Sequence, residues 1–163
     1  MRAVRWLVVF GILLCAAGQA CADAADPQTE KEIKEIGESF VKAYEKKDLA
    51  QLMSLFAQDK DVVVLDNSPN GRHVGTTEIK AAFEKEFADT PKVTIKTEWM
   101  SVGGKGDVAW FAGELTAKME SPEEKLTIPV RWSGQLTKRQ GKWLFLLAHF
   151  SFSGPEPEVP KTK

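Results

Sequence analysis

The hydrophobic period of the chain changes at Pro91, and this change constrains the fold more than any other feature of the sequence. Before Pro91, apolar residues recur every three or four positions, which is the spacing of one helical face. After Pro91, Val93 and Ile95 begin an alternation of apolar and polar residues, which is the spacing of a half-buried strand. Helices followed by strands predict helices covering one face of an antiparallel sheet.

The half before Pro91 contains three predicted helices and one short strand. An apolar stripe predicts a helix over residues 30–47, in which Gly37 costs about 1 kcal/mol relative to alanine unless a neighbour packs closely there. Asp48 is typical of an N-cap and predicts a second helix from Leu49 to Phe56. Residues 61–66 predict a strand, residues 67–71 a turn, and residues 75–90 a third helix.

The half after Pro91 contains four predicted strands in a meander. The strands begin near Lys92, Val108, Leu126 and Trp143, with turns at Gly103–Asp107, Ser121–Glu124 and Gln140-Gly141. We therefore expect an α+β fold with three N-terminal helices packed on a strongly curved, mostly antiparallel sheet. A curved sheet that holds a helix on its concave side forms a cone with a central pocket, where function is sought.

The N-terminus has the pattern of a secretory signal peptide. Arg2 and Arg5 precede the apolar run Trp6–Ala17, which is shorter than the roughly 20 residues that span a bilayer in a helix. Cleavage after Ala22 predicts a periplasmic or secreted protein, and lipidation of Cys21 is the alternative. The predicted organisation is a signal peptide (1–22), a flexible lead-in (23–29), one domain (30–153) and a disordered tail (154–163).

Composition excludes several classes of function. The chain carries 22 Lys plus Arg against 23 Asp plus Glu, a net charge of −1, so it has no excess of positive charge to bind nucleic acid. Its two cysteines lie at or before residue 21, so the predicted mature protein has no thiol for catalysis. His149 lies in a strand and His73 in a Gly/Asn-rich loop that we expect to be exposed, so no metal site is predicted. No cofactor motif is found.

The order of these segments resembles the SnoaL-like domains of the nuclear transport factor 2-like superfamily. The resemblance covers residues 30–153 and rests on the Lys47-Asp48 break, Phe56-Ala57-x-Asp59, His73-Val74-Gly75 with Ile79 and Phe83, Gly106–Trp110, Pro129–Gly134, Gly141–Trp143 and His149–Ser151. It implies a cone with a pocket and frequent dimerisation through the sheet. It implies no single function, because this superfamily contains isomerases, dehydratases, hydrolases, binding modules and assembly domains.

Asp66 ends the first predicted strand, where the resemblance to the ketosteroid isomerase branch implies a general base. That branch also uses a tyrosine as oxyanion donor, and the matching position here is Phe40, which cannot donate a hydrogen bond. Tyr44, one helical turn later, is the only tyrosine of the chain and is the available substitute. The alternative is that Asp66 only begins the following turn.

Arg131 interrupts a mostly apolar strand. A guanidinium in a cavity needs an anion, so Arg131 indicates either a carboxylate ligand or an internal partner, namely Glu114 or Asp66. The resemblance places Arg131 and His149 toward the cavity. An odd-length loop near Gln140 would pair Arg131 with His149 and place both on one face with Ser133 and Ser151. The alternatives are an Arg131–Glu114 pair that only stabilises the sheet and a core histidine bonded to Ser133.

Trp110 is one of four tryptophans on predicted strands, whose rings either line a ligand pocket or pack in the core or a dimer interface.

We expect a non-catalytic, exported binding protein for a small molecule, forming a homodimer through the sheet. The alternatives are an isomerase, dehydratase or hydrolase of a small cyclic substrate with Asp66 or His149 as base, and an assembly domain. The predicted pocket residues are Tyr44, Asp66, Trp110, Glu114, Arg131, Ser133 and His149.

Overall fold

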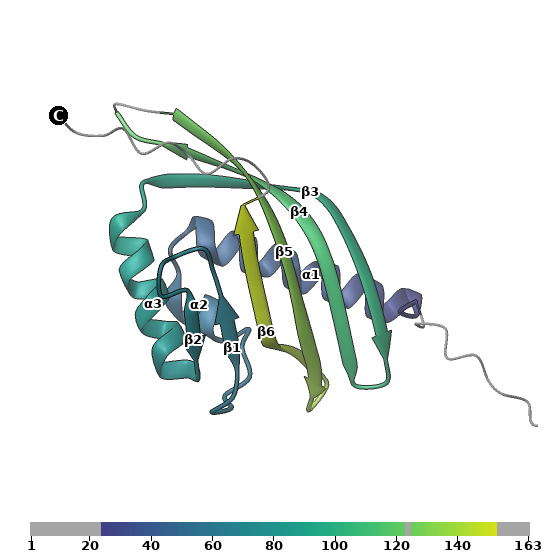
Figure 1. Cartoon of the computed structure of the whole chain (residues 1–163). Coiled ribbons are helices and arrows are strands. Elements are labelled where there is room, and N and C mark those ends of the chain that lie inside the picture. Colours follow the sequence, from purple (N-terminus) through teal and green to yellow (C-terminus); the bar gives the residue numbers. More distant parts are fainter. Residues whose placement is uncertain (1–23, 123–124, 153–163) are drawn as a thin grey trace, which may run out of the picture.

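The computed structural model describes residues 24–122 and 125–152 (Figure 1). These residues form three helices and six strands in the order α1, α2, β1, β2, α3, β3, β4, β5, β6. The helices are α1 (Pro27–Glu45), α2 (Leu49–Met53) and α3 (Thr76–Asp89). The strands are β1 (Val63–Leu65), β2 (Arg72–Val74), β3 (Lys92–Lys105), β4 (Val108–Glu120), β5 (Lys125–Arg139) and β6 (Lys142–Phe152). The predicted signal peptide and C-terminal tail lie outside the described residues.

The strands form one sheet in the order β2-β1-β6-β5-β4-β3. All pairs are antiparallel except β1 with β6. Figure 1 shows α1 lying across one face of the curved sheet and α3 standing beside β1 and β2. We call the face that α1 covers the inner face and the opposite one the outer face. The predicted α+β class and the curved, mostly antiparallel sheet are confirmed.

Local sequence accounts for the helix boundaries. The Asp26 carboxylate accepts hydrogen bonds from the backbone N–H groups of Gln28 and Thr29, so α1 begins at Pro27 rather than at residue 30. The predicted N-cap Asp48 accepts from the N–H of Gln51 at 2.9 Å, but α2 is shorter than predicted and ends at Met53. Lys47 has a φ of 54°, a left-handed conformation that breaks the chain between the two helices.

Two details of the sheet differ from the prediction. Strand β2 was not predicted, because three residues are too few to show an alternation that distinguishes a strand from a loop. The predicted loop 103–107 is mostly strand, since β3 continues to Lys105 and only Gly106 and Asp107 form the turn. Gly106 has a φ of 60°, a conformation that glycine adopts without strain.

Aromatic side chains fill the centre of the space between α1 and the sheet. The Phe40 ring of α1 lies 5.5–6.3 Å, centroid to centroid, from six other rings. These rings are Tyr44, Phe56, Phe83, Trp132, Phe145 and Phe150. Their burial provides much of the hydrophobic stabilisation that holds the helices on the sheet.

Two glycines make room for the Trp132 indole, which spans the gap between β4 and α1. A Cβ atom on Gly37 of α1 would lie 3.2 Å from Trp132 Cη2, and a Cβ atom on Gly113 of β4 would lie 2.4 Å from Trp132 Nε1. Close packing against Gly37 is the condition under which a glycine inside this helix is tolerated.

Candidate functional site

The seven predicted pocket residues fall into two groups on opposite faces of the sheet. Tyr44 of α1 and Asp66, at the end of β1, lie on the inner side. The other five lie on the outer face, because strand residues alternate between faces and these five share one parity in the ladder. They are Trp110, Glu114, Arg131, Ser133 and His149. The expectation that all seven line one pocket is therefore wrong.

Arg131 points into solvent rather than into a hollow. Its Nε atom lies 4.0 Å from Glu114 Oε1, and the two side chains are 64% and 57% exposed. An ion pair this exposed is screened by water and contributes at most about 1 kcal/mol. The structure therefore favours the alternative of a surface pair within the sheet, and His149, which is also exposed on this face, is not a core histidine.

The β5–β6 register explains why Arg131 and His149 share a face, as predicted, although they do not form the pair with each other that was also predicted. The hairpin has a two-residue turn, Gln140-Gly141, with φ values of 50° and 78°. A bulge leaves Leu146 without a partner in the ladder and supplies the odd residue that the loop lacks. Arg131 consequently pairs with Ser151, and Ser133 pairs with His149.

Four polar side chains meet on the inner side, and we call them the mouth cluster: Tyr44, Asp66, His73 and Glu86. They come from α1, the end of β1, β2 and α3. The Tyr44 hydroxyl donates a hydrogen bond to Glu86 Oε1 at 2.5 Å. Asp66 Oδ2 lies 3.0 Å from His73 Nε2. The cluster therefore brings together the Tyr44–Glu86 pair, whose members are 42 positions apart in the sequence, and the Asp66–His73 pair, whose members are seven positions apart.

Asp66 both begins the predicted turn and belongs to the cluster. Its Oδ1 accepts a hydrogen bond from the Ser68 backbone N–H at 2.7 Å, and its Oδ2 contacts His73. Partial burial opposes ionisation of the Asp66 carboxyl, but the hydrogen bonds from Ser68 and His73 outweigh it and hold its pKa below the usual value. Asp66 is therefore a carboxylate at neutral pH and a weak proton acceptor.

In the Tyr44–Glu86 pair the pKa values of both groups are raised, whereas the pKa of Asp66 is lowered. Desolvation of its carboxyl group raises the pKa of Glu86, and the nearby Asp66 charge adds to this effect. Burial and the neighbouring Glu86 charge raise the pKa of the Tyr44 phenol, which therefore keeps its proton and remains a hydrogen-bond donor.

An incompletely covered apolar strip lies beside the mouth cluster on the inner face. The parallel register pairs Leu65 of β1 with His149 of β6, so the next residues, Asp66 and Phe150, lie side by side. Phe150 and Val130 are half-buried, and Phe152 is 43% exposed. The Phe87 ring lies 5.3 Å from Tyr44. The site thus offers charged groups, a phenol and aromatic surface together.

Sequence reasoning missed two members of this cluster. His73 was expected to be exposed, but its side chain is only 19% exposed because β2 holds it against Asp66. Glu86 has the same sequence pattern as the solvent-facing charges of α3, and its pairing with Tyr44 spans 42 positions of the chain. The single tyrosine in an apolar helical stripe was the available signal that a polar partner was needed there.

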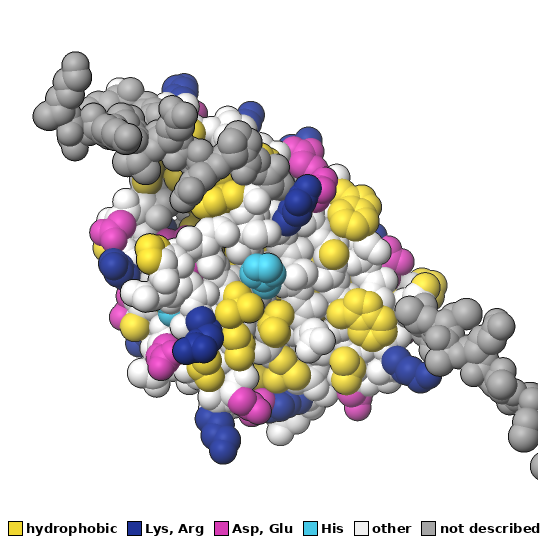
Figure 2. All heavy atoms as spheres, viewed as in Figure 1, with side chains coloured by type: hydrophobic (Ala, Val, Ile, Leu, Met, Phe, Trp, Pro, Cys, Tyr) yellow, Lys and Arg dark blue, Asp and Glu magenta, His cyan; other side chains and the backbone are white. Residues whose placement is uncertain are grey.

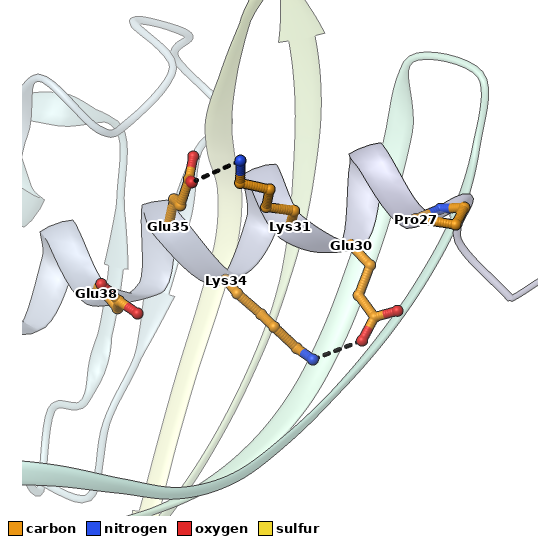
Figure 3. A pocket seen from close by; sticks show the side chains of 6 residues that line it. All are labelled: Pro27, Glu30, Lys31, Lys34, Glu35 and Glu38. Carbon is orange, nitrogen blue, oxygen red and sulfur yellow. Dashed lines mark hydrogen bonds and ion pairs between the residues drawn. The ribbon is translucent and has the colours of Figure 1, made fainter.

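Two other observations concern ligand sites. A shallow hollow of about 350 Å³ along α1 is lined by Pro27, Glu30, Lys31, Lys34, Glu35 and Glu38 (Figure 3). Its lysines pair with glutamates one turn away, which is typical of a solvated helix face (Figure 3).

Within residues 24–122 and 125–152, no group of three or more potential metal ligands occurs. No helix in the same part of the chain is both long and apolar enough for a membrane span.

The outer face presents apolar side chains to solvent. The Trp110 indole lies flat over Gly103, where a Cβ atom would be 2.3 Å from Trp110 Nε1. Trp110 is 38% exposed, Val108 48% and Trp99 53%. Figure 2 shows hydrophobic side chains gathered over the strands on this face, with a histidine among them.

Comparison with known proteins identifies relatives of this fold. A family profile described as SnoaL-like domain matches residues 33–155. A nuclear transport factor 2-like superfamily protein from Salmonella enterica is 17% identical, covering 85% of this chain and 100% of its own, with a TM-score of 0.72. A protein of unknown function with a cystatin-like fold from Nostoc punctiforme is 19% identical, covering 84% of this chain and 98% of its own, with a TM-score of 0.68. A "putative dehydratase from the NTF2-like family" of Streptomyces avermitilis is 18% identical, covering 78% and 98%, with a TM-score of 0.68. No curated protein matches significantly.

Proposed function

The chain belongs to the SnoaL-like domain family, within the nuclear transport factor 2-like superfamily, and we propose that it is a non-catalytic binding protein for a small molecule. The ligand contacts the mouth cluster. The observation that carries this proposal is the meeting of Tyr44, Asp66, His73 and Glu86 beside the half-open apolar strip of Phe150 and Phe152. Small-molecule sites in proteins combine largely apolar walls with a few convergent polar groups.

The protonation states of the cluster favour binding over general-base catalysis. A general base works best with a pKa near the operating pH, whereas the pKa of Asp66 is lowered by its hydrogen bonds. The Tyr44 hydroxyl is already engaged with Glu86. Both groups are arranged to hold a ligand in a fixed orientation, while neither is arranged to take a proton from it.

The enzymatic alternative is an isomerase, dehydratase or hydrolase of a small cyclic substrate. The name of the Streptomyces neighbour is consistent with this class. Asp66 would be its base, because His149 lies on the outer face away from the mouth cluster. A substrate that is consumed on the purified protein, with activity lost in Asp66→Asn, would favour this alternative over binding.

Native mass spectrometry of the protein purified from its own host tests the proposal. We expect a carried small molecule whose occupancy falls in Glu86→Gln, which removes a charge from the mouth cluster, and in Tyr44→Phe, which removes its hydroxyl group. Glu114→Gln is the matched control, since Glu114 is an exposed carboxylate on the outer face. Equal loss of ligand in the control, or a protein that carries no ligand, would overturn the proposal.

A second proposal concerns assembly, namely that two copies pair through the outer face. The exposed apolar surface around Trp110 and Val108 supports it, because apolar patches of this kind mark interaction surfaces. Trp110→Glu should convert a dimer into a monomer in native mass spectra, whereas Lys85→Glu on the exposed side of α3 should not. A wild-type protein that is monomeric at high concentration would contradict the dimer.

Export rests on residues 1–22, outside the described part of the chain. We propose that cleavage after Ala22 releases a periplasmic or secreted protein. N-terminal sequencing should then find Asp23 first, and a lipid-modified Cys21 would support the anchored alternative.

A further inference from the structure

The hydrogen-bond donors of the mouth cluster are already used within it. The Tyr44 hydroxyl donates to Glu86 Oε1 at 2.5 Å. Because Asp66 is a carboxylate, the His73 Nε2 atom that lies 3.0 Å from it carries a proton and donates. A neutral imidazole with its proton on Nε2 has no second N–H group. These four side chains therefore hold no spare donor for a ligand.

Hydrogen-bond acceptors remain on both carboxylates of the cluster. A carboxylate has two oxygens and about four lone-pair positions. Among the described residues, Glu86 accepts from Tyr44, and Asp66 accepts from Ser68 and His73. The Asp66 side chain is 32% exposed, so a ligand can reach its remaining positions. The cluster therefore selects a ligand that donates hydrogen bonds.

The charges around the cluster favour a positively charged ligand. Within residues 24–122 and 125–152, neither Asp66 nor Glu86 forms an ion pair with a lysine or an arginine. The Lys47 ammonium is bound to two carbonyl oxygens at the end of α3. Arg72 lies on the opposite face of β2 from His73, because neighbouring strand residues alternate. A ligand cation would thus relieve the repulsion between the two carboxylates.

Aromatic rings lie beside these carboxylates. The Tyr44 and Phe87 rings are 5.3 Å apart, centroid to centroid. Phe150 lies next to Asp66 through the parallel register, and Phe152 is 43% exposed. Aromatic faces attract cations, and their exposed area removes an apolar ligand body from water. A charged nitrogen on a short arm of a ring satisfies both parts of the site.

We propose that the ligand of the mouth cluster is an organic ammonium ion, in which a protonated primary amine is attached to a ring or another compact apolar body. The ammonium group donates hydrogen bonds to Glu86 and Asp66, and the apolar body covers Phe150 and Phe152. This inference rests on the proposed function, since it names the class of ligand that the same site takes.

Four probes with the same aromatic ring separate charge from hydrogen bonding: benzylammonium, benzyltrimethylammonium, benzyl alcohol and benzoate. Calorimetric titration should find that benzylammonium binds roughly tenfold or more tightly than neutral benzyl alcohol, because charge-assisted hydrogen bonds are the stronger ones. Benzyltrimethylammonium keeps the positive charge but has no N–H group, so its affinity should lie between these two. Benzoate carries a negative charge and should bind most weakly.

Two glutamates of α3 supply a variant and its matched control. Glu86→Gln removes a charge from the mouth cluster and should weaken benzylammonium binding by roughly tenfold while changing benzyl alcohol binding less. Glu84→Gln removes the same charge from the same helix, but Glu84 is 54% exposed and pairs with Lys80. The control should therefore leave both affinities unchanged. In ¹H–¹⁵N spectra, benzylammonium should shift the backbone amides of His73 and Glu86.

Several results would overturn the ammonium ligand and leave the site in place. They are benzyl alcohol, benzoate or benzyltrimethylammonium binding at the mouth cluster as tightly as benzylammonium does, and equal effects of Glu86→Gln and Glu84→Gln. A carried molecule without a basic nitrogen, found in native mass spectra and lost in Glu86→Gln, would have the same meaning. Failure of the proposed function is a different result, namely no carried molecule and no probe that shifts His73 or Glu86, and it would overturn both.

Discussion

The Trp132 indole lies directly over Gly113 of the neighbouring strand, so close that a Cβ atom on Gly113 would be 2.4 Å from Nε1. Trp110 has the same relationship to Gly103 at 2.3 Å. The two pairs differ in burial, because Trp132 on the inner face is 2% exposed and Trp110 on the outer face is 38% exposed. They form a natural comparison of one contact in two environments.

Gly113→Ala should destabilise the protein much more than Gly103→Ala does. To make room for a Cβ atom on Gly113, the Trp132 ring would have to move against Phe111 and Phe40, at a cost of about 1–3 kcal/mol. Trp110 can instead turn into solvent to make room for a Cβ atom on Gly103. Chemical denaturation of both variants measures the difference. Equal losses of unfolding free energy would show that the surroundings of the two indoles do not matter.

Glu86→Gln should raise the melting temperature at pH 7 by a few degrees and leave it nearly unchanged at pH 4. The folded-state pKa of Glu86 lies above its unfolded value, so ionisation of Glu86 destabilises the fold as the pH rises through this range. Glutamine keeps an oxygen that accepts from Tyr44 and removes the charge. A lower melting temperature at pH 7 would mean that the ionised Tyr44–Glu86 bond stabilises the fold.

Asp66→Asn should have the opposite pH dependence. The folded-state pKa of Asp66 lies below the unfolded value, so its contribution is present above pH 4 and is lost as the pH falls through the folded-state pKa. The variant should therefore be less stable than the wild type at pH 6 and equally stable near pH 2. Melting curves across this range measure the effect, and a constant difference at all pH values would contradict it.

Lys47→Met should destabilise the protein by about 1 kcal/mol. Lys47 Nζ donates to the carbonyl oxygens of Phe87 at 2.8 Å and Thr90 at 2.6 Å, which lie at the C-terminal end of α3. Lys46→Met is the control, because Lys46 is an exposed neighbour of the same charge. If the two variants unfold at the same denaturant concentration, the bonds to α3 contribute nothing measurable.

Arg131→Ala should change stability by less than about 1 kcal/mol and should not change ligand occupancy. The reason is the exposed position of its pair with Glu114 on the outer face. Native mass spectrometry and thermal unfolding of the variant test both statements. Loss of ligand without loss of stability would place the ligand on the outer face instead of at the mouth cluster.

Periodicity predicted the major elements because each is long enough to show its period and each buries one face. The stripe that ends at Tyr44 and the alternation that begins at Val93 are both local signals. Register is not local. The bulge at Leu146 decides how Arg131 and His149 pair, and no turn residue marks it in the sequence, so the predicted pairing was wrong although the shared face was right.

The amino-acid sequence by itself determined the helices, the long strands, the N-cap at Asp48 and the turn that Asp66 begins, because spacing and residue type within a few positions govern these features. Only the tertiary structure decided which polar residues meet. Tyr44 and Glu86 are 42 positions apart and become neighbours because α1 and α3 pack at the same end of the sheet. Alternation along β5 puts Arg131 and Trp132 on opposite faces, but only the packing of α1 over the Trp132 face decided that Arg131 is the one in solvent. The parallel pairing of β1 with β6 likewise placed Asp66 beside Phe150.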